Sequence, residues 1–403
     1  MATVEIHGST QAADIPSPDE LRRRARAMGP ALRANARKCE DNRSMLPETM
    51  EAFEQAGFYR ILQPKAYGGF EYWPTVFYDV VMEVARHCPS SAWALGIVGI
   101  HNWEVGLMHP RVAEDLWEKD TSTRFSSSYA PFGKAERVDG GYRVEGRWSW
   151  SSGCDQATWV IVGALVDMEA GEKNHLALLV APGDYEIDHA SWDTSGMAGS
   201  GSKDIVIKSA FVPAYRVHNI SEAYEMADPG RAAFTADTYK LAFGTVFAFA
   251  LTSVLIGIAD AALDFYIDYM SKRTNAYNGT SFKQDPLAQQ TLADAHSLVD
   301  GAHLRLKRDF EEMAGCVARG EEIPFARRVF YKWDAANIAK QCRDAVNMLT
   351  HASGGSIFSH DVPMQRLFRD ANAGSAHLFI NHQKNSVNFG AFLLSGQNSD
   401  LML

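Results

Sequence analysis

The strongest constraint on the fold is an uncharged run from Leu241 to Ala259, LAFGTVFAFALTSVLIGIA. By length this run could just span a bilayer. It is the only such run in the chain, however, and no loop rich in Lys and Arg flanks it asymmetrically. Thr, Ser and Gly are spaced through it, and helices that are apolar on all sides occur in large protein cores. We therefore expect a buried helix of a helical bundle and no membrane association.

The segments before this run differ in character along the chain. With 403 residues, the chain exceeds the roughly 250–300 residues at which a single core usually stops growing. Helical patterns come first, short β-rich runs separated by turns follow, and long helical patterns return from about Phe234. We expect an α+β fold with an N-terminal α-helical domain (1–120), a middle β domain (121–232) and a C-terminal four-helix bundle (233–403).

Local signals refine the helical segments. Ser17 and Glu20 form a capping box with Pro18 at the first helical position, so a helix is expected to begin there. Gly29-Pro30 predicts a kink or a break in that helix. Near the C-terminus, the segment 364–385 is expected to form a bundle helix.

Composition argues against several classes of function. A net charge of −10 is not typical of a nucleic-acid binder, which usually has a basic face. The five cysteines are scattered without a CxxC pair, as in reduced cytoplasmic proteins, and the N-terminal segment lacks the pattern of a signal peptide. His296 and His303 are about two helical turns apart, too far to share one ion. No metal site is expected.

Two motifs rich in Ser and Gly do not match common catalytic patterns. GMAGSGSK (196–203) lacks the GK[ST] of a phosphate loop and precedes a strand, so it is either a turn or a ligand contact. WSWSSGC (148–154) lacks the GxSxG of a nucleophile elbow and lies within a β run, which argues against a serine hydrolase. No GxGxxG follows an early strand, so a Rossmann dinucleotide site is not supported.

A set of motifs in a fixed order carries a more specific signal. They are LQPKAYGG (62–69), IHNW (100–103), SSSYAPFGK (126–134), WSSGCDQA (150–157), GSGSK (199–203), FVPAYR (211–216) and QRLFRDANAGSAH (365–377). With these motifs the chain resembles, over nearly its whole length, the acyl-CoA dehydrogenase superfamily. Within it, the chain is similar to the group D two-component flavin-dependent monooxygenases, which include the oxygenase components that hydroxylate a secosteroid phenol and p-hydroxyphenylacetate.

This resemblance implies an oxygenase that receives diffusible reduced FMN or FAD from a separate NAD(P)H-dependent flavin reductase. It implies hydroxylation of an aromatic substrate, phenolic, indolic or polycyclic, with O2 through a flavin C4a-hydroperoxide. It also implies a homotetramer, or a dimer, in which a neighbouring subunit contributes to each site. The residues that the resemblance places along the flavin are Trp93, Ser128, Tyr129, Ala130, Ser151 and Ser152, with Ser152 hydrogen-bonded near N5.

The resemblance also assigns catalytic residues. His101 matches the residue that faces the substrate hydroxyl, and an imidazole with an ordinary pKa of about 6.5 can accept a phenol proton. Ser127 matches a residue that contacts the substrate. His377 matches the histidine near the flavin C4a, where a cationic imidazole would stabilise developing negative charge. For the flavin phosphate, the resemblance points to Arg273 and to the loop residues Gly354, Gly355 and Ser356.

The main alternative is an acyl-CoA dehydrogenase-type flavoprotein. In that branch a glutamate near the end of the chain often removes the α-proton of the substrate, and 371–401 contains no Glu. The p-hydroxyphenylacetate enzymes carry an Arg where this chain has Gly244, which favours a larger and more apolar substrate here. The C-terminal tail departs from both patterns, so an N- or S-oxygenating relative is a further alternative.

Overall fold

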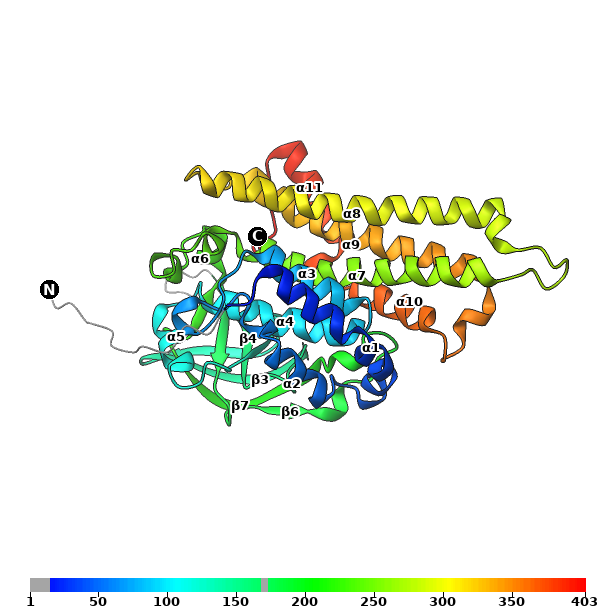
Figure 1. The fold of residues 1–403 in the computed structure, drawn as a ribbon. Coiled ribbons are helices and arrows are strands. Elements are labelled where there is room, and N and C mark those ends of the chain that lie inside the picture. Colours follow the sequence, from blue (N-terminus) through cyan, green and yellow to red (C-terminus); the bar gives the residue numbers. More distant parts are fainter. Residues whose placement is uncertain (1–14, 168–172) are drawn as a thin grey trace.

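The computed structural model describes residues 15–167 and 173–403. The expectation that no signal peptide is present concerns the segment that includes residues 1–14, which lies outside these ranges. Within them, helices come first, two sheets follow, and long helices complete the chain (Figure 1). The expected α+β order of elements is confirmed.

The N-terminal part consists of helices that pack on one another and on the long helix α7. Its α-helices are α1 (Pro18–Asn42), α2 (Pro47–Gln55), α3 (Pro74–Ala85), α4 (Pro89–Val105) and α5 (Pro110–Trp117), with short 3-10 helices η1 (Phe58–Arg60) and η2 (Lys65–Tyr67). Every residue of α4 is buried, so this helix forms part of the central core. α4 carries Trp93 and His101, two of the predicted site residues.

The first helix shows how tertiary packing overrides a local signal. The Ser17 hydroxyl accepts a hydrogen bond from the Glu20 amide (3.2 Å), which confirms the predicted N-cap. α1 runs through Pro30 without a break, so of the two predicted outcomes a break is wrong and a kink stays a prediction. One side of α1 is buried, and a Cβ on Gly29 would lie 2.5 Å from the His87 Nε2. This close packing offsets the one backbone hydrogen bond that a proline removes.

The β region forms two four-stranded sheets, and buried residues from both sheets make one apolar cluster. One sheet has the order β1-β4-β5-β8 and the other has the order β2-β3-β7-β6. β1 runs parallel to β4, and the other pairs in the two sheets are antiparallel. The strands are β1 (Phe125–Ser128), β2 (Lys134–Val138), β3 (Gly141–Ser151), β4 (Trp159–Asp167), β5 (Lys173–Val180), β6 (Glu186–Asp188), β7 (Lys203–Pro213) and β8 (Val217–Asn219). The 3-10 helices η3 (His189–Ser191) and η4 (Ala198–Ser200) lie between β6 and β7.

The C-terminal part is a bundle built around α7, which contains the uncharged run. By length and composition α7 could cross a membrane, yet 94% of its most apolar window is buried inside the protein, as in a bundle core helix. Figure 1 shows α7, α8 and α9 lying along one another. The short helices α6 (Ile220–Tyr224) and η5 (Pro229–Ala232) precede this part. Its own elements are η6 (Asp237–Lys240), α7 (Phe243–Lys272), η7 (Phe282–Gln284), α8 (Pro286–Ala318), α9 (Phe325–Ala352), η8 (Gly355–Phe358), α10 (Pro363–Gly374), η9 (Leu378–Ile380) and α11 (His382–Ser395).

The predicted helix over 364–385 is divided in the structure. α10 ends at Gly374, and a Cβ on this glycine would lie 2.9 Å from the Met197 Cε and 3.2 Å from the Trp93 Cζ3. His377 follows the break as the N-cap of η9, so it lies in a connection and not on a helix face. The domain boundaries at 120/121 and 232/233 both fall between elements and stay predictions.

Candidate active site

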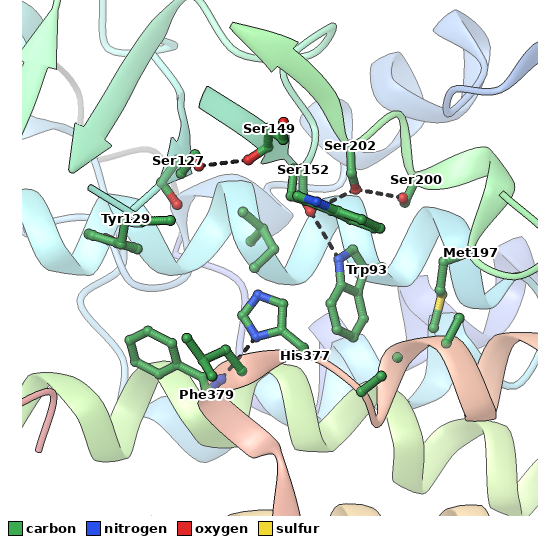
Figure 2. Close-up of a pocket in the computed structure, with 18 of the residues that line it drawn as sticks. Trp93, Ser127, Tyr129, Ser149, Ser152, Met197, Ser200, Ser202, His377 and Phe379 are labelled. Carbon is green, nitrogen blue, oxygen red and sulfur yellow. Dashed lines mark hydrogen bonds between the residues drawn. The ribbon is translucent and has the colours of Figure 1, made fainter. Parts of the chain in front are cut away.

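A cavity of about 880 Å³ lies between the β sheets and the helical bundle (Figure 2). α4 contributes Trp93, β1 contributes Ser127, α7 contributes Phe247 and the connection after α10 contributes His377. Of the residues predicted from the sequence, those that line this cavity are Trp93, Ser127, Ser128, Tyr129, Ala130, Ser152 and His377. Motifs that are far apart in the chain therefore meet at one place.

An irregular strand end explains how WSWSSGC reaches the cavity. The pairing of β3 with β7 shifts register between Trp148 and Ser151, and Trp150 has a positive φ of 70°. Such a bulge redirects the side chains that follow it. Trp148 is buried in the core of the β region, Trp150 is 63% exposed at the cavity, and Ser152 faces the cavity. Gly153, with φ of 71°, then turns the chain away from β3.

The Ser152 hydroxyl belongs to a row of hydroxyl groups along one wall. It accepts a hydrogen bond from the Trp93 Nε1 (3.1 Å) and is bonded to the Ser202 hydroxyl (2.8 Å). Ser202 is in turn 2.8 Å from the Ser200 hydroxyl (Figure 2). Both serines come from the motif GMAGSGSK, for which a turn and a ligand contact were both open, and both line the cavity. The Ser152 hydroxyl is thus bonded to side chains of this wall.

The loop that carries Ser200 and Ser202 is anchored to the bundle. The Asp370 Oδ1 accepts a hydrogen bond from the Met197 amide (2.6 Å), and Met197 adopts a positive φ of 55°. Burial raises the pKa of Asp370 to about 7. Asp370 therefore links α10 to the loop that lines the cavity.

Ser151 and Ser128 have different surroundings from Ser152. Ser151 is fully buried and donates to the Ser126 hydroxyl (3.0 Å), so it does not line the cavity. Ser128 lines the cavity, and its hydroxyl donates to the Ser149 carbonyl (2.7 Å). The predicted contact of Ser151 with the flavin edge is therefore not supported by its position.

His377 lies opposite the hydroxyl row, with its ring edge-on to Trp93 at a centroid distance of 5.7 Å. Its Nδ1 accepts a hydrogen bond from the Phe379 amide (3.3 Å), which requires an unprotonated nitrogen. Burial, with a smaller effect of Lys332, lowers the pKa of His377 to about 4. The imidazole is thus neutral at pH 7, whereas the family resemblance drawn from the motifs implied a cationic imidazole.

His101 lies behind the cavity wall and not in the wall. It is fully buried, and its ring contacts Tyr129 and Phe247, which both line the cavity. Its Nδ1 and the Tyr129 hydroxyl both bond to the Glu104 Oε2, at 2.6 Å and 2.5 Å. Among the described residues, none forms a hydrogen bond with the His101 Nε2.

Glu104 connects this wall to a buried chain of charges. The His218 Nδ1 donates to the Glu104 Oε1 (2.6 Å), and its Nε2 donates to the Asp228 Oδ1 (3.0 Å). Burial alone would lower the pKa of His218, but the hydrogen bonds to Asp228 and Glu104 raise it to about 9. Burial would raise the pKa of Glu104, but its hydrogen bonds with His101 and His218 lower it to about 2. At neutral pH, Tyr129 is therefore held by a carboxylate paired with an imidazolium.

The residues expected at the flavin phosphate lie at the far end of the bundle. Arg273 follows α7, and its Nη1 donates to the Ser353 carbonyl beside Gly354. Ser356 bonds to the Tyr269 hydroxyl (2.8 Å) in the same region. Phe247 lines the cavity at the other end of α7, and a rise of about 1.5 Å per residue separates it from Arg273 by about 39 Å. Arg273, Gly354, Gly355 and Ser356 are brought together, but not with the cavity of their own chain.

The cavity walls fit a flat heteroaromatic group such as the flavin ring system. One edge offers the hydroxyls of Ser152, Ser202 and Ser200, which can donate or accept toward ring nitrogens and carbonyls. Trp93 and Phe379 add flat apolar surfaces beside them. The described residues contain no cluster of three or more His, Cys, Asp or Glu that could hold a metal ion.

Sequence reasoning missed several cavity residues. Phe247 lies in the uncharged run, where nothing distinguishes one aromatic residue from the next. Lys332 lies on a buried face of α9 with Val329, Ala336 and Ala339. A lysine among apolar residues at helical spacing is the sequence pattern that could have identified it as a functional residue. Other lining residues that were not predicted include Trp150, Trp192, Met197, Ser200, Ser202, Phe379, Lys384 and Met402.

Comparisons with known proteins agree with this architecture. Residues 249–382 match the family model described as acyl-CoA dehydrogenase, C-terminal domain. The chain is 34% identical over 365 residues to the flavin-dependent monooxygenase, oxygenase subunit HsaA, of Rhodococcus jostii (strain RHA1), covering 90% of this chain and 95% of the relative. It is 29% identical over 357 residues to the p-hydroxyphenylacetate 3-hydroxylase, oxygenase component, of Acinetobacter baumannii, covering 88% and 84%. The crystal structure of the HsaA monooxygenase from M. tuberculosis matches with a TM-score of 0.90 at 33% identity, over 96% of this chain and 100% of that chain.

These matches extend over nearly the whole chain, so they cover the helices, the sheets and the bundle that together enclose the cavity. They confirm the resemblance drawn from the motifs, the acyl-CoA dehydrogenase-like fold and the dependence on flavin. The chain belongs to the family of flavin-dependent monooxygenase oxygenase subunits.

Proposed function

We propose that this protein is the oxygenase component of a two-component system that hydroxylates a phenolic, indolic or polycyclic aromatic substrate. Its partner is a separate NAD(P)H-dependent reductase that supplies reduced FMN or FAD by diffusion. The observation that carries the proposal is the cavity in which Trp93, the hydroxyl row of Ser152 and the neutral His377 face one another. Its volume of about 880 Å³ lies in the upper range of small-molecule sites.

Reduced flavin, when bound, supplies the electrons that activate O2 for transfer of one oxygen atom. Ser152 would hold the polar edge of the ring, since its hydroxyl is fixed by Trp93 and Ser202. Tyr129 and Ala130 would line the ring, and Ser127 would contact the substrate. His101 would accept the substrate proton, and its unpartnered Nε2 supports this role. His101 does not itself line the cavity, but its ring contacts Tyr129 and Phe247, which do.

The oligomeric arrangement and the location are also parts of the proposal. Arg273 with the loop 354–356 would bind the flavin phosphate of a neighbouring subunit in a homotetramer or dimer, because these residues lie far along α7 from their own cavity. The scattered free cysteines support a cytoplasmic location.

An acyl-CoA dehydrogenase requires a base beside the substrate, commonly a carboxylate. None of the described residues that line the cavity is Asp or Glu. This charge pattern favours the oxygenase over the dehydrogenase.

A stopped-flow experiment tests the proposal. The protein is mixed with chemically reduced FMN or FAD and then with 18O2, together with 2-naphthol, indole or a polycyclic hydrocarbon. We expect flavin reoxidation slower than in free solution and a product that contains 18O. Reoxidation at the rate of free flavin, with no labelled product from any substrate of the panel, would contradict the proposal.

A further inference from the structure

One end of the cavity is cationic. The described residues that line the cavity include two lysines, Lys332 from α9 and Lys384 from α11, and no acidic residue. Lys384 is 40% exposed, and its Nζ lies 3.7 Å from the Asp400 carboxylate. Lys332 is only 1% exposed. A ligand that binds at this end of the cavity therefore contacts the buried amino group of Lys332.

The contacts of Lys332 leave its charge without a direct counterion. Its Nζ donates to the Met402 carbonyl (3.0 Å), lies 3.5 Å from the Gly244 carbonyl and stands 3.7 Å above the ring of Phe379. Among the described residues, no carboxylate lies within ion-pair distance of the Lys332 Nζ. Asp400 is the acidic residue that affects its pKa, and the Asp400 carboxylate pairs with Lys384. A buried charge is costly unless it is paired and hydrogen-bonded. Two carbonyls leave one of its three N–H groups available.

The charge of Lys332 responds to what occupies the cavity. Burial lowers the pKa of Lys332 to about 7, while Asp400 raises it and Lys384 lowers it further. His377, the other titratable group that faces Lys332, has a pKa of about 4 and is neutral above pH 6. Near neutral pH an anion that enters the cavity therefore favours the protonated lysine, and above the pKa of Lys332 this attraction is lost.

From this geometry we propose that Lys332, with Lys384 at the rim, binds an anionic oxygen of the aromatic substrate, a carboxylate or a phenolate. The inference rests on the proposed function and narrows its substrate class. A substrate held through this oxygen beside Phe379 has its ring oriented in the cavity, so Lys332 determines specificity. Gly244 has no side chain, but this end of the cavity still carries a cation, because the Nζ of Lys332 on α9 lies 3.5 Å from the Gly244 carbonyl.

A binding experiment without flavin or O2 tests this inference separately from oxygenase activity. The probes are 2-naphthoate, 2-naphthol and the uncharged 2-naphthamide, measured by titration calorimetry at pH 6.5 and pH 9. We expect native protein at pH 6.5 to bind at least one acidic probe about 10-fold more tightly than the amide. A hydrogen bond to a charged group changes affinity by about this factor. A preference for naphthoate assigns a carboxylate, and the absorbance shift of ionised 2-naphthol on binding assigns a phenolate.

Two variants complete the design. In Lys332→Met, which keeps the volume and removes the charge, the preference over the amide should vanish, and so should the loss of naphthoate affinity between pH 6.5 and pH 9. Lys340→Met serves as the matched control, because Lys340 lies on the same helix and pairs with Asp344. An equal affinity for acid and amide in native protein would overturn the inference. A Lys332→Met protein that keeps the preference would also overturn it, as would one that loses reduced-flavin affinity instead.

Discussion

At the scale of single residues, the adjacent serines 151 and 152 allow a matched comparison. Ser152→Ala removes the acceptor of the Trp93 Nε1 and the partner of Ser202. An unsatisfied buried donor costs about 1–3 kcal/mol, so we expect a loss of that order in the free energy of unfolding, together with weaker flavin binding. Urea unfolding and titration with reduced flavin under anaerobic conditions measure both effects.

Ser151→Ala is the control for that variant. In the described part of the chain its hydroxyl bonds to Ser126 behind the wall, so the substitution should lower stability and leave the affinity for flavin unchanged. A similar loss of flavin affinity in both variants would show that the Ser152 hydroxyl has no particular role.

The same pair shows what the sequence could and could not predict at this scale. Three of the serines in the motifs, Ser127, Ser128 and Ser152, line the cavity, while their contacts with flavin or substrate stay predictions. They did not separate Ser151 from Ser152, because that difference depends on a bulge with a positive φ at Trp150, a residue type that does not signal such a conformation. The neutral state of His377 could not be predicted from the sequence either, because its low pKa results from burial among residues that are distant in sequence.

At the scale of elements, a series of hydrogen bonds from Tyr129 through Glu104 and His218 to Asp228 connects the residue that follows β1 to α4 and β8. The pKa of His218 is about 9, above its ordinary value of 6.5. Its contribution to stability is therefore complete below pH 6.5 and is lost as the pH rises through 9. Glu104→Gln breaks this buried pair, and we expect a loss of about 3–5 kcal/mol at pH 6.5 and a smaller loss at pH 9.5.

Urea unfolding of native and variant protein at the two pH values measures this difference. Glu51→Gln, at an exposed position of α2, should change stability little at either pH. If Glu104→Gln lowered the free energy of unfolding by the same amount at pH 6.5 and pH 9.5, the charge of the His218 imidazolium would not contribute to the stabilising effect of Glu104.

Elements were easier to predict than their ends. The uncharged run gave the core helix α7, since its composition leaves no polar face to expose. The helix break after Gly374 was missed because the local pattern continues through it, whereas in the structure Trp93 and Met197, both distant in sequence, lie close to that glycine. Pro30 shows the opposite case, in which packing holds a helix together through a residue that usually ends one.

At the scale of the whole molecule, the separation between cavity and Arg273 predicts sites shared between subunits. Each complete site would combine His377 and Ser152 of one subunit with Arg273 of another. Arg273→Ala should weaken flavin binding without changing the cavity of its own chain, because the contacts of Arg273 among the described residues lie with Ser353, Tyr269 and Phe282. The sequence placed Arg273 near a phosphate by resemblance, and it could not show which copy of the chain receives it.

Mixed oligomers decide the point. Arg273→Ala and His377→Ala subunits with different tags are unfolded, mixed in equal amounts, refolded together and purified through both tags. If sites are shared, a cavity with intact His377 can meet an intact Arg273 of its neighbour. Random mixing then restores about a quarter of all sites, and purification through both tags raises this share to about two sevenths in a tetramer and about one half in a dimer. Oxygenase turnover should therefore exceed that of either variant refolded alone. If each chain formed its site by itself, every cavity in the mixture would lack one group, and turnover would stay at the level of the separate variants.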